Sequence, residues 1–199
     1  EPGDTVSIGS GIFFTGGLGL VLQPMADTVL AMVKAVGDST TVVFDINCRP
    51  KVVGDRAAYL NRVNQLLKRA DIVKVSDDDL AYLSPGISVL DAAHQLRAAS
   101  GAAVLVTAGA STTSIVTGDS VIEVPVAPLD SPVVDSIGAG DTFGGALVAW
   151  WMASGRGRPD VDAEGLQQAV LAAHEAAAVV VTRRGADPPR RAELPDDWV

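Results

Sequence analysis

Short runs of β-branched and apolar residues alternate along this chain with segments of helical periodicity. The runs at 41–45 and 103–107 are rich in β-branched and apolar residues, which is typical of strands that are covered on both faces. Between such runs, apolar residues recur at helical spacing, as in Leu60, Val63, Leu66 and Leu67. This alternation predicts an α/β fold with a mostly parallel central sheet covered by helices on both faces, and with ligands bound at the carboxyl ends of its strands.

The expected elements follow one another over short links and form one domain over residues 1–199. Strands are predicted at 6–14, 41–45, 71–75 and 103–107, and a hairpin at 114–117 and 121–126. Helices are predicted at 25–36, 56–68, 76–83, 89–98, 141–153 and 163–181. The charged, proline-rich tail from Asp187 is expected to pack loosely.

Composition excludes several classes of partner. The formal net charge of −9 argues against nucleic acid and against anionic membranes, because both require clustered Lys and Arg. The single cysteine, Cys48, forms no internal disulfide, which fits a reducing compartment. Since no apolar run approaches the roughly 18 residues that cross a bilayer, and the acidic start lacks the features of a signal peptide, we expect a soluble, cytoplasmic protein.

The stretch 133–145 combines a short β-branched run, two close glycines and the start of a helix. Amides at a helix N-terminus are unpaired and carry about half a positive charge, so they attract a phosphate. Gly138 and Gly140 allow a close approach of the backbone, and Asp141 brings a carboxylate within reach of an acceptor hydroxyl. The structural alternative for Asp141 is a helix cap.

This stretch also carries a family resemblance. Asp135-Ser136-Ile137-Gly138-Ala139-Gly140-Asp141-Thr142-Phe143 resembles the signature Asp-Thr-x-Gly-Ala-Gly-Asp-x-Phe of the ribokinase, or PfkB-type, carbohydrate kinases. Other family-like segments occur in the same order, at 44–50, 73–80, 106–109 and 181–186. The chain resembles the C-terminal two-thirds of such a kinase, with bacterial fructokinases the most similar branch, and the N-terminal part and the lid are missing.

The resemblance implies an ATP-dependent sugar kinase with a ribokinase-like three-layer fold. Asp141 would be the general base, and the amides of Gly138, Ala139 and Gly140 would form an anion hole for the transferred γ-phosphoryl group. Fructose is the favoured acceptor, and 2-keto-3-deoxygluconate or another sugar is the alternative. A different class is an inactive nucleotide-binding fragment that acts as an interaction module. A homodimer of the full-length protein is compatible with the resemblance.

Several further residues are expected to contact nucleotide or metal. By resemblance, the nucleotide contacts are Asn47, Arg49, Ser76, Thr107, Gly109, Thr112 and His174, with Arg49 also facing the substrate. Asp45 and Asp79 are expected near Mg²⁺. The alternatives are a loop turn for the segment 45–49, a capping box for Ser76 and Asp79, and a structural role for His174. Thr112 stands where relatives often have glycine, so its loop must take another path or use the hydroxyl.

A monovalent cation, K⁺ in particular, is a further expectation from the resemblance. Its ligands would be Asp135, Ile137, Val180 and Gly185, several of them through backbone carbonyls.

Other nucleotide and metal motifs are absent from the sequence. It has no Gly-Lys-Ser/Thr of a P-loop and no Gly-x-Gly-x-x-Gly before a helix, and its two histidines and one cysteine are too far apart for a structural zinc site.

Overall fold

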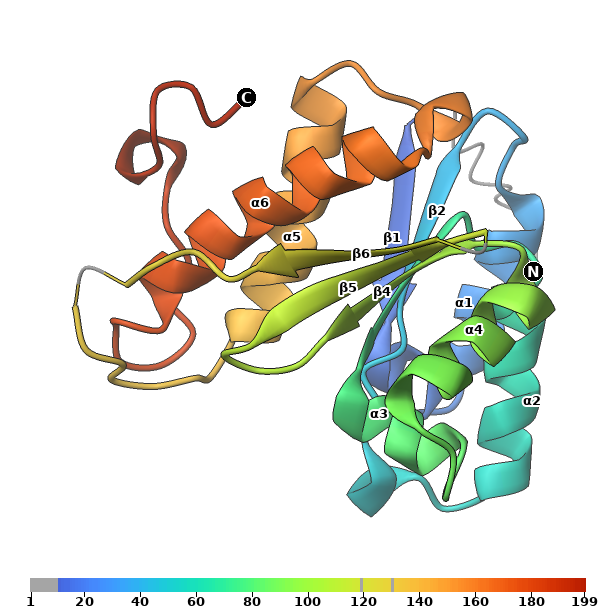
Figure 1. Ribbon diagram of the computed structural model, residues 1–199. Helices are drawn as coiled ribbons and strands as arrows, with labels where there is room; N and C mark the ends of the chain where they lie inside the picture. The colour runs from blue at the N-terminus through green and yellow to red at the C-terminus, as the bar shows by residue number, and fades with distance from the viewer. Residues whose placement is uncertain (1–10, 119, 130) are drawn as a thin grey trace.

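A six-stranded sheet forms the centre of the computed structural model, which describes residues 11–118, 120–129 and 131–199 (Figure 1). The strands lie in chain order. β1 (Ile12–Gly16), β2 (Thr41–Asp45), β3 (Ile72–Ser76) and β4 (Ala103–Thr107) are parallel, and β5 (Thr112–Thr117) and β6 (Ser120–Pro125) add an antiparallel hairpin. The expected α/β fold with a mostly parallel sheet is confirmed.

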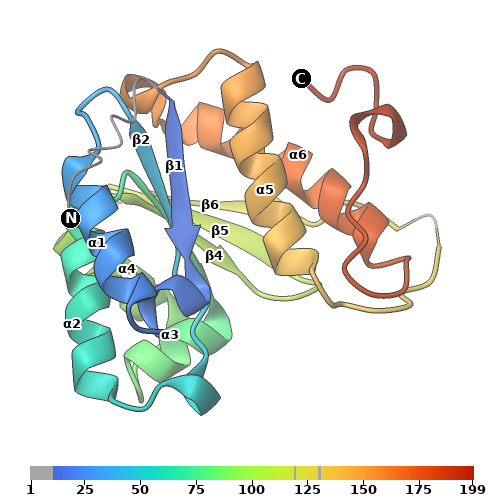
Figure 2. The ribbon, with the colours of Figure 1, turned by 180° about the vertical axis from the view of Figure 1, so that it is seen from behind.

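Helices cover both faces of the sheet (Figures 1 and 2). One face carries α1 (Met25–Ala35), α2 (Arg56–Leu67), α3 (Asp77–Leu83) and α4 (Val89–Ser100). The other face carries α5 (Ala139–Ala153) and α6 (Ala163–Val180). Short 3₁₀ turns lie at Gly17–Leu20, Pro50–Val52, Arg158–Asp160 and Arg191–Glu193.

The central strands divide their side chains between two hydrophobic cores. Phe44, Val73 and Val104 pack against the layer of α1 to α4. Val43, Ile72 and Leu105 point the other way, toward α5 and α6. Because side chains of a strand alternate between faces, a strand buried on both sides has apolar residues on both, as the sequence pattern indicated.

Most predicted elements agree with the structure to within two residues at each end. β1 begins at Ile12, and the first five residues of the strand predicted at 6–14 lie outside the described residues. The expectation of a loosely packed tail was wrong at its end. Trp198 is buried, and its indole Nε1 donates a hydrogen bond to the carbonyl of Ala172 in α6 at 3.0 Å.

Within the described ranges, none of the helices combines the length and the apolar character that crossing a bilayer requires.

Candidate active site at the carboxyl edge of the sheet

The four parallel strands end along one edge of the sheet. Strand pairing places Gly16 beside Asp45, and Asp45 beside Lys74. A Cβ on Gly16 would lie 1.7 Å from the backbone oxygen of Asp45, so only glycine permits this approach of β1 to β2. The segment that follows β2 therefore lies close to the end of β1, and its polar side chains gather at this edge.

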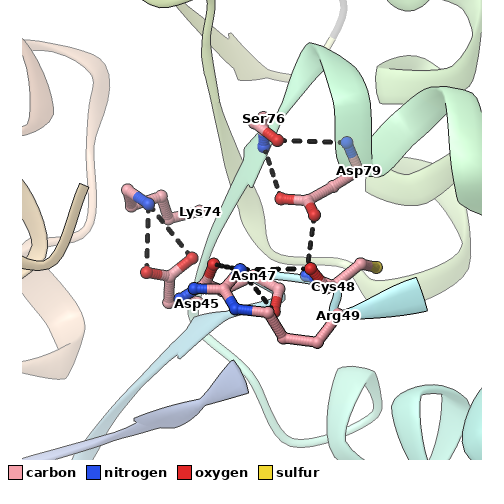
Figure 3. Close-up of polar contacts among 7 residues, drawn as sticks. All are labelled: Asp45, Asn47, Cys48, Arg49, Lys74, Ser76 and Asp79. Atoms are coloured by element: carbon pink, nitrogen blue, oxygen red, sulfur yellow. Dashed lines mark hydrogen bonds and ion pairs between the residues drawn. The ribbon is translucent and has the colours of Figure 1, made fainter. Parts of the chain in front are cut away.

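Asp45 and Lys74 form a buried ion pair at the ends of β2 and β3 (Figure 3). The Lys74 ammonium Nζ lies 3.1 Å from Oδ1 and 3.0 Å from Oδ2 of Asp45. Burial raises the pKa of the Asp45 carboxyl; Lys74 opposes this shift, and the carboxylates of Asp79 and Asp141 add to it. An ionised Asp45 therefore depends on the lysine beside it.

Asp79 ties the loop after β2 to the start of α3 (Figure 3). Its Oδ1 accepts the amide of Cys48 at 2.7 Å, and its Oδ2 accepts the amide of Ser76 at 3.0 Å. The hydroxyl of Ser76 in turn accepts the amide of Asp79, which completes the predicted capping box. Both Asp79 oxygens accept amides and its side chain is short, so its expected place near Mg²⁺, with a water molecule between them, stays a prediction.

Half-buried Asn47 and exposed Arg49 lie in the same loop. Asn47 has a φ of 40°, in the left-handed region that asparagine tolerates better than most residues. The guanidinium of Arg49 donates to the side-chain oxygen of Asn47 and to the carbonyl of Cys48. The loop thus has the guanidinium of Arg49 at the surface, bonded to groups of the loop itself.

The first turn of α5 leaves amides without acceptors. Gly138 is the N-cap, with a φ of 79°, and a Cβ there would lie 2.7 Å from the Cβ of Ala186. The amide of Ala139 donates to the carbonyl of Ser136 at 3.2 Å, but those of Gly138, Gly140 and Asp141 have no acceptor in the described part of the chain. The alternative of Asp141 as the cap is wrong, because Gly138 has that position and Asp141 is an exposed residue of the first turn.

This turn of α5 lies directly over the buried ion pair. A Cβ on Gly140 would be 3.7 Å from the ammonium of Lys74. The charge of Asp141 also contributes to the raised pKa of Asp45. The strand ends and the N-terminus of α5, which lie about 60 to 100 residues apart in the sequence, therefore form one site.

The residues expected around a monovalent cation join the loop before α5 to the loop after α6. The carboxylate of Asp135 accepts the amide of Ile137 at 2.9 Å and the amide of Gly185 at 3.1 Å. The carbonyl of Val180, at the end of α6, accepts the amide of Arg183 at 3.0 Å. Each of these oxygens keeps a lone pair, so the geometry is compatible with a cation, which stays a prediction.

The expected nucleotide residues further along the sheet lie around β4, β5 and α6. Thr107 ends β4, and Gly109, with a φ of 54°, forms the turn into β5. Thr112 begins β5 with an ordinary φ, and its hydroxyl donates to the carboxylate of Glu123 at 2.6 Å. The loop thus takes a path that does not need a second glycine.

His174 is buried between α6 and the hairpin. Its Nδ1 lies 3.0 Å from the carbonyl of Pro125 and its Nε2 2.8 Å from the hydroxyl of Thr113. Because a carbonyl only accepts, Nδ1 carries the proton and Nε2 accepts from the threonine. Burial lowers the pKa of His174, although the bond to Pro125 opposes this. With both nitrogens engaged, the geometry favours the structural role that the sequence left open.

A groove of about 780 Å³ shares Gly138 and Asp141 with the site. It otherwise runs along α5 beneath the tail, with alanines and prolines as much of its wall. None of the polar residues at the strand ends lines it, so a triphosphate would find few partners there.

Among the described residues, no three His, Cys, Asp or Glu side chains cluster as a metal cage. Magnesium fits this donor set, because it is commonly held by one or two carboxylates, phosphates and water.

The sequence placed Lys74 in the family-like segment 73–80 but gave it no role in the site. A lysine inside the buried run Ile72-Val73-Lys74-Val75 was the available signal, because a buried lysine requires a partner. The partner was not identifiable, since Asp45 lies 29 residues earlier.

The chain matches a known protein family. The profile of the pfkB family carbohydrate kinases matches residues 7–193. The chain belongs to this family. Among pfkB proteins, a fructokinase of Rhizobium leguminosarum bv. trifolii is 33% identical over 135 residues, which cover 67% of this chain and 40% of the relative.

Solved pfkB-type structures agree with the fold. Aminoimidazole riboside kinase from Salmonella enterica, complexed with aminoimidazole riboside and an ATP analogue, matches with 28% identity and a TM-score of 0.79 over 89% of this chain and 58% of that one. Fructokinase from Vibrio cholerae O395, in its form with fructose, ADP and calcium, matches with 26% identity and a TM-score of 0.77 over 90% and 57%. The chain therefore spans about half the length of these relatives.

Proposed function

We propose that this protein is an ATP-dependent sugar kinase that transfers the γ-phosphoryl group to a sugar hydroxyl, with fructose as the first candidate acceptor. The observation that carries the proposal is the first turn of α5, where amides without acceptors lie next to the exposed carboxylate of Asp141. The related fructokinase that was solved with fructose and ADP supports fructose. Aminoimidazole riboside, bound by another relative, is the second candidate acceptor.

In this mechanism Asp141 accepts the proton of the attacking hydroxyl, or orients it. The amides of Gly140 and Asp141, together with that of Gly138 and the helix macrodipole, stabilise the negative charge on the transferred group. A donor of this type contributes roughly 3 kcal/mol to transition-state stabilisation in acyl-transfer enzymes. The amide of Ala139, which was also expected in the anion hole, is held by Ser136 and contributes to the turn instead.

Magnesium, when bound with the nucleotide, would neutralise phosphate charge, and Asp45 is the carboxylate proposed to hold its water shell. Asp79 has a more distant part, because its oxygens secure the loop that carries Asn47 and Arg49. Arg49 is proposed to turn from its own loop toward a phosphate, as a planar donor suited to phosphate oxygens. Ser76, Thr107, Gly109 and Thr112 are proposed to lie along the nucleotide, and the loops joined by Asp135 are proposed to hold a potassium ion.

The direct test is release of ADP from ATP in the presence and absence of sugar. Fructose, 2-keto-3-deoxygluconate and aminoimidazole riboside are offered separately to the 199-residue chain and to a version extended to the length of its relatives. Sugar-dependent ADP release by the extended protein supports the proposal, and the preferred sugar gives the substrate. ATP binding without sugar-dependent turnover in both versions would favour the alternative of an inactive nucleotide-binding module.

A further inference from the structure

A buried contact between Cys48 and Tyr59 holds the loop 46–49 from the side away from the strand ends. The sulfur of Cys48 and the hydroxyl oxygen of Tyr59 lie 3.3 Å apart, and both side chains are buried. Figure 3 shows this sulfur pointing away from the ion pair of Asp45 and Lys74. Tyr59 lies in the first turn of α2, a helix with a capped N-terminus. The contact therefore joins the loop to a well-ordered helix outside the site.

Cys48 is fixed in two directions. Its amide donates to Oδ1 of Asp79 in α3 at 2.7 Å, while its thiol contacts Tyr59 in α2. Arg49 follows directly in the chain, and its guanidinium donates to the carbonyl of Cys48 at 3.1 Å. Because one peptide bond links the two residues, the orientation of Cys48 decides where the backbone of Arg49 points. Two helices thus determine the position of the exposed arginine.

Asn47, on the other side of Cys48, has an unusual backbone conformation. Its φ of 40° is the one positive value for a non-glycine residue in the ranges that the structure describes. Such a conformation costs free energy and persists where the surrounding contacts hold it. A bond from the next residue to Tyr59 is one such contact. Loss of this bond should therefore loosen the turn from which Arg49 extends.

The contact is a neutral hydrogen bond near pH 7. Burial raises the pKa of the Cys48 thiol to about 12, although the bond to Tyr59 opposes this shift, and burial also raises the pKa of the Tyr59 hydroxyl. Both groups therefore stay protonated. Phenylalanine beside an apolar residue would fill the same space without a polar atom to satisfy, so stability alone is a weak reason for this pair.

We propose that Tyr59 is a positioning residue that directs Arg49 toward the phosphates of the nucleotide, acting through its bond to Cys48. The inference rests on the proposed kinase function and adds to it a residue that does not touch the ligand. It has a distinctive consequence, because the hydroxyl of Tyr59 matters for binding only while Arg49 is present.

The test is calorimetric titration with the β,γ-imido analogue of ATP at fixed magnesium. In Tyr59→Phe, affinity for the analogue is expected to fall roughly 3- to 10-fold, about the worth of one neutral hydrogen bond. Tyr82→Phe is the matched control. Its ring lies 6.4 Å from that of Tyr59, and its hydroxyl has no hydrogen-bond partner in the described part of the chain. Affinity in this control should change less than about twofold.

A double-mutant cycle shows whether Tyr59 acts through the arginine. Arg49→Gln is itself expected to bind the analogue more weakly, because it removes the charged donor. Adding Tyr59→Phe to it should change affinity less than about twofold. A merely structural tyrosine would give the same loss with and without Arg49. Hydrogen exchange of the Cys48 amide, measured without nucleotide, should be faster in Tyr59→Phe and unchanged in Tyr82→Phe.

Thermal unfolding separates positioning from folding. A thiol is a weak donor and acceptor, so leaving Cys48 without its partner should lower Tm little. Cys48→Val combined with Tyr59→Phe makes both partners apolar and keeps the fold if the single variant does not. This double variant should lose as much affinity for the analogue as Tyr59→Phe, because the bond is absent from both.

The outcomes separate the two proposals. An unchanged affinity in Tyr59→Phe, an equal loss in Tyr82→Phe or in the Arg49→Gln background, or full binding by the double variant with Cys48→Val would overturn the role of Tyr59. The kinase proposal would survive each of these if the unmodified protein binds the analogue and releases ADP with sugar. If the unmodified protein binds no nucleotide, both proposals fall.

Discussion

The two edges of the sheet each hold an aspartate paired with cations, and they use it differently. At the amino edge, the carboxylate of Asp71 accepts the amide of Val42 at 2.8 Å and the guanidinium groups of Arg69 and Arg158 at 3.0 and 2.7 Å. These arginines also donate to backbone carbonyls of residues 37, 38 and 40. At the carboxyl edge, Asp45 has Lys74 as its charged partner, beneath amides without acceptors.

The comparison shows which polar cluster completes the fold and which has bonding capacity left for a ligand. At the amino edge the three side chains join β2, β3 and the segment before α6, and the Asp71 carboxylate raises the pKa of Arg158. At the carboxyl edge, donors from β3 and α5 face the same region without a shared acceptor. A substitution at one edge should therefore change stability, and a substitution at the other should change function.

The largest effect is expected at the carboxyl edge. Asp141→Asn should lower sugar-dependent turnover by roughly 10²- to 10⁴-fold, because it removes a general base. Affinity for the imido analogue of ATP and the Tm should stay close to those of the unmodified protein, since Asp141 is exposed and does not cap α5. Steady-state assays and calorimetry measure both. A parallel loss of nucleotide binding would argue against a base role.

The amino edge should give the reverse result. Asp71→Ala is expected to lower the free energy of unfolding by about 2–3 kcal/mol, less than for a fully buried pair because both arginines reach solvent. Nucleotide affinity of the folded protein should be unchanged. Chemical denaturation and calorimetry on the same preparation test this. If Asp71→Ala weakened nucleotide binding without destabilising the protein, the contrast between the edges would be lost.

A substitution at Gly138 should change both the stability of the protein and its affinity for nucleotide. Gly138→Ala should cost about 1–2 kcal/mol of stability, because alanine is strained at a positive φ. The new Cβ would also press on Ala186, so the start of α5 should shift and nucleotide affinity should fall as well. Gly145→Ala, in the same helix and with open space around a Cβ, is the control and should leave stability unchanged or raised. Equal behaviour of the two variants would contradict the assigned turn geometry.

The smallest effect is expected at His174, between α6 and the hairpin of β5 and β6. Its pKa in the folded protein is lowered, so the unfolded chain takes up a proton first as the pH falls below about 6.5. Stability should therefore decrease from about pH 6.5 downward, until the pKa of the folded state is passed, and should not depend on this group above that range. Denaturation from pH 8 to 5 should show a shallower decline in His174→Gln. If stability declined with pH equally in His174→Gln, other titratable groups would be responsible for the decline.

Local features were the ones that the sequence predicted well. The bounds of β2 and β4 matched, because a short run rich in β-branched and apolar residues is typical of a strand buried on both faces. The capping box of Ser76 and Asp79 was also predictable, since its partners lie three residues apart. The residues of the candidate anion site came from one continuous stretch, and the family that they indicated is confirmed.

Contacts between distant segments could not be predicted in the same way. Thr113 and His174 lie 61 residues apart, and nothing in either segment specifies the pairing. Ala139 belonged to the expected anion hole, but the turn before α5 uses its amide for Ser136, which depends on the actual φ of Gly138. The buried end of the tail was missed because its composition indicated solvent, while the bond from the indole of Trp198 to the carbonyl of Ala172 decided its position.

The anchored indole of Trp198 has a practical consequence. It lines the same groove as Asp141, whereas Trp150 and Trp151 lie within α5 and do not line it. An indole at a boundary between apolar core and water changes its emission when its surroundings become wetter or drier. The fluorescence of Trp198 can therefore report on this contact. Comparison with Trp198→Phe would show how much of any ligand-induced change in emission comes from Trp198 leaving its place against α6.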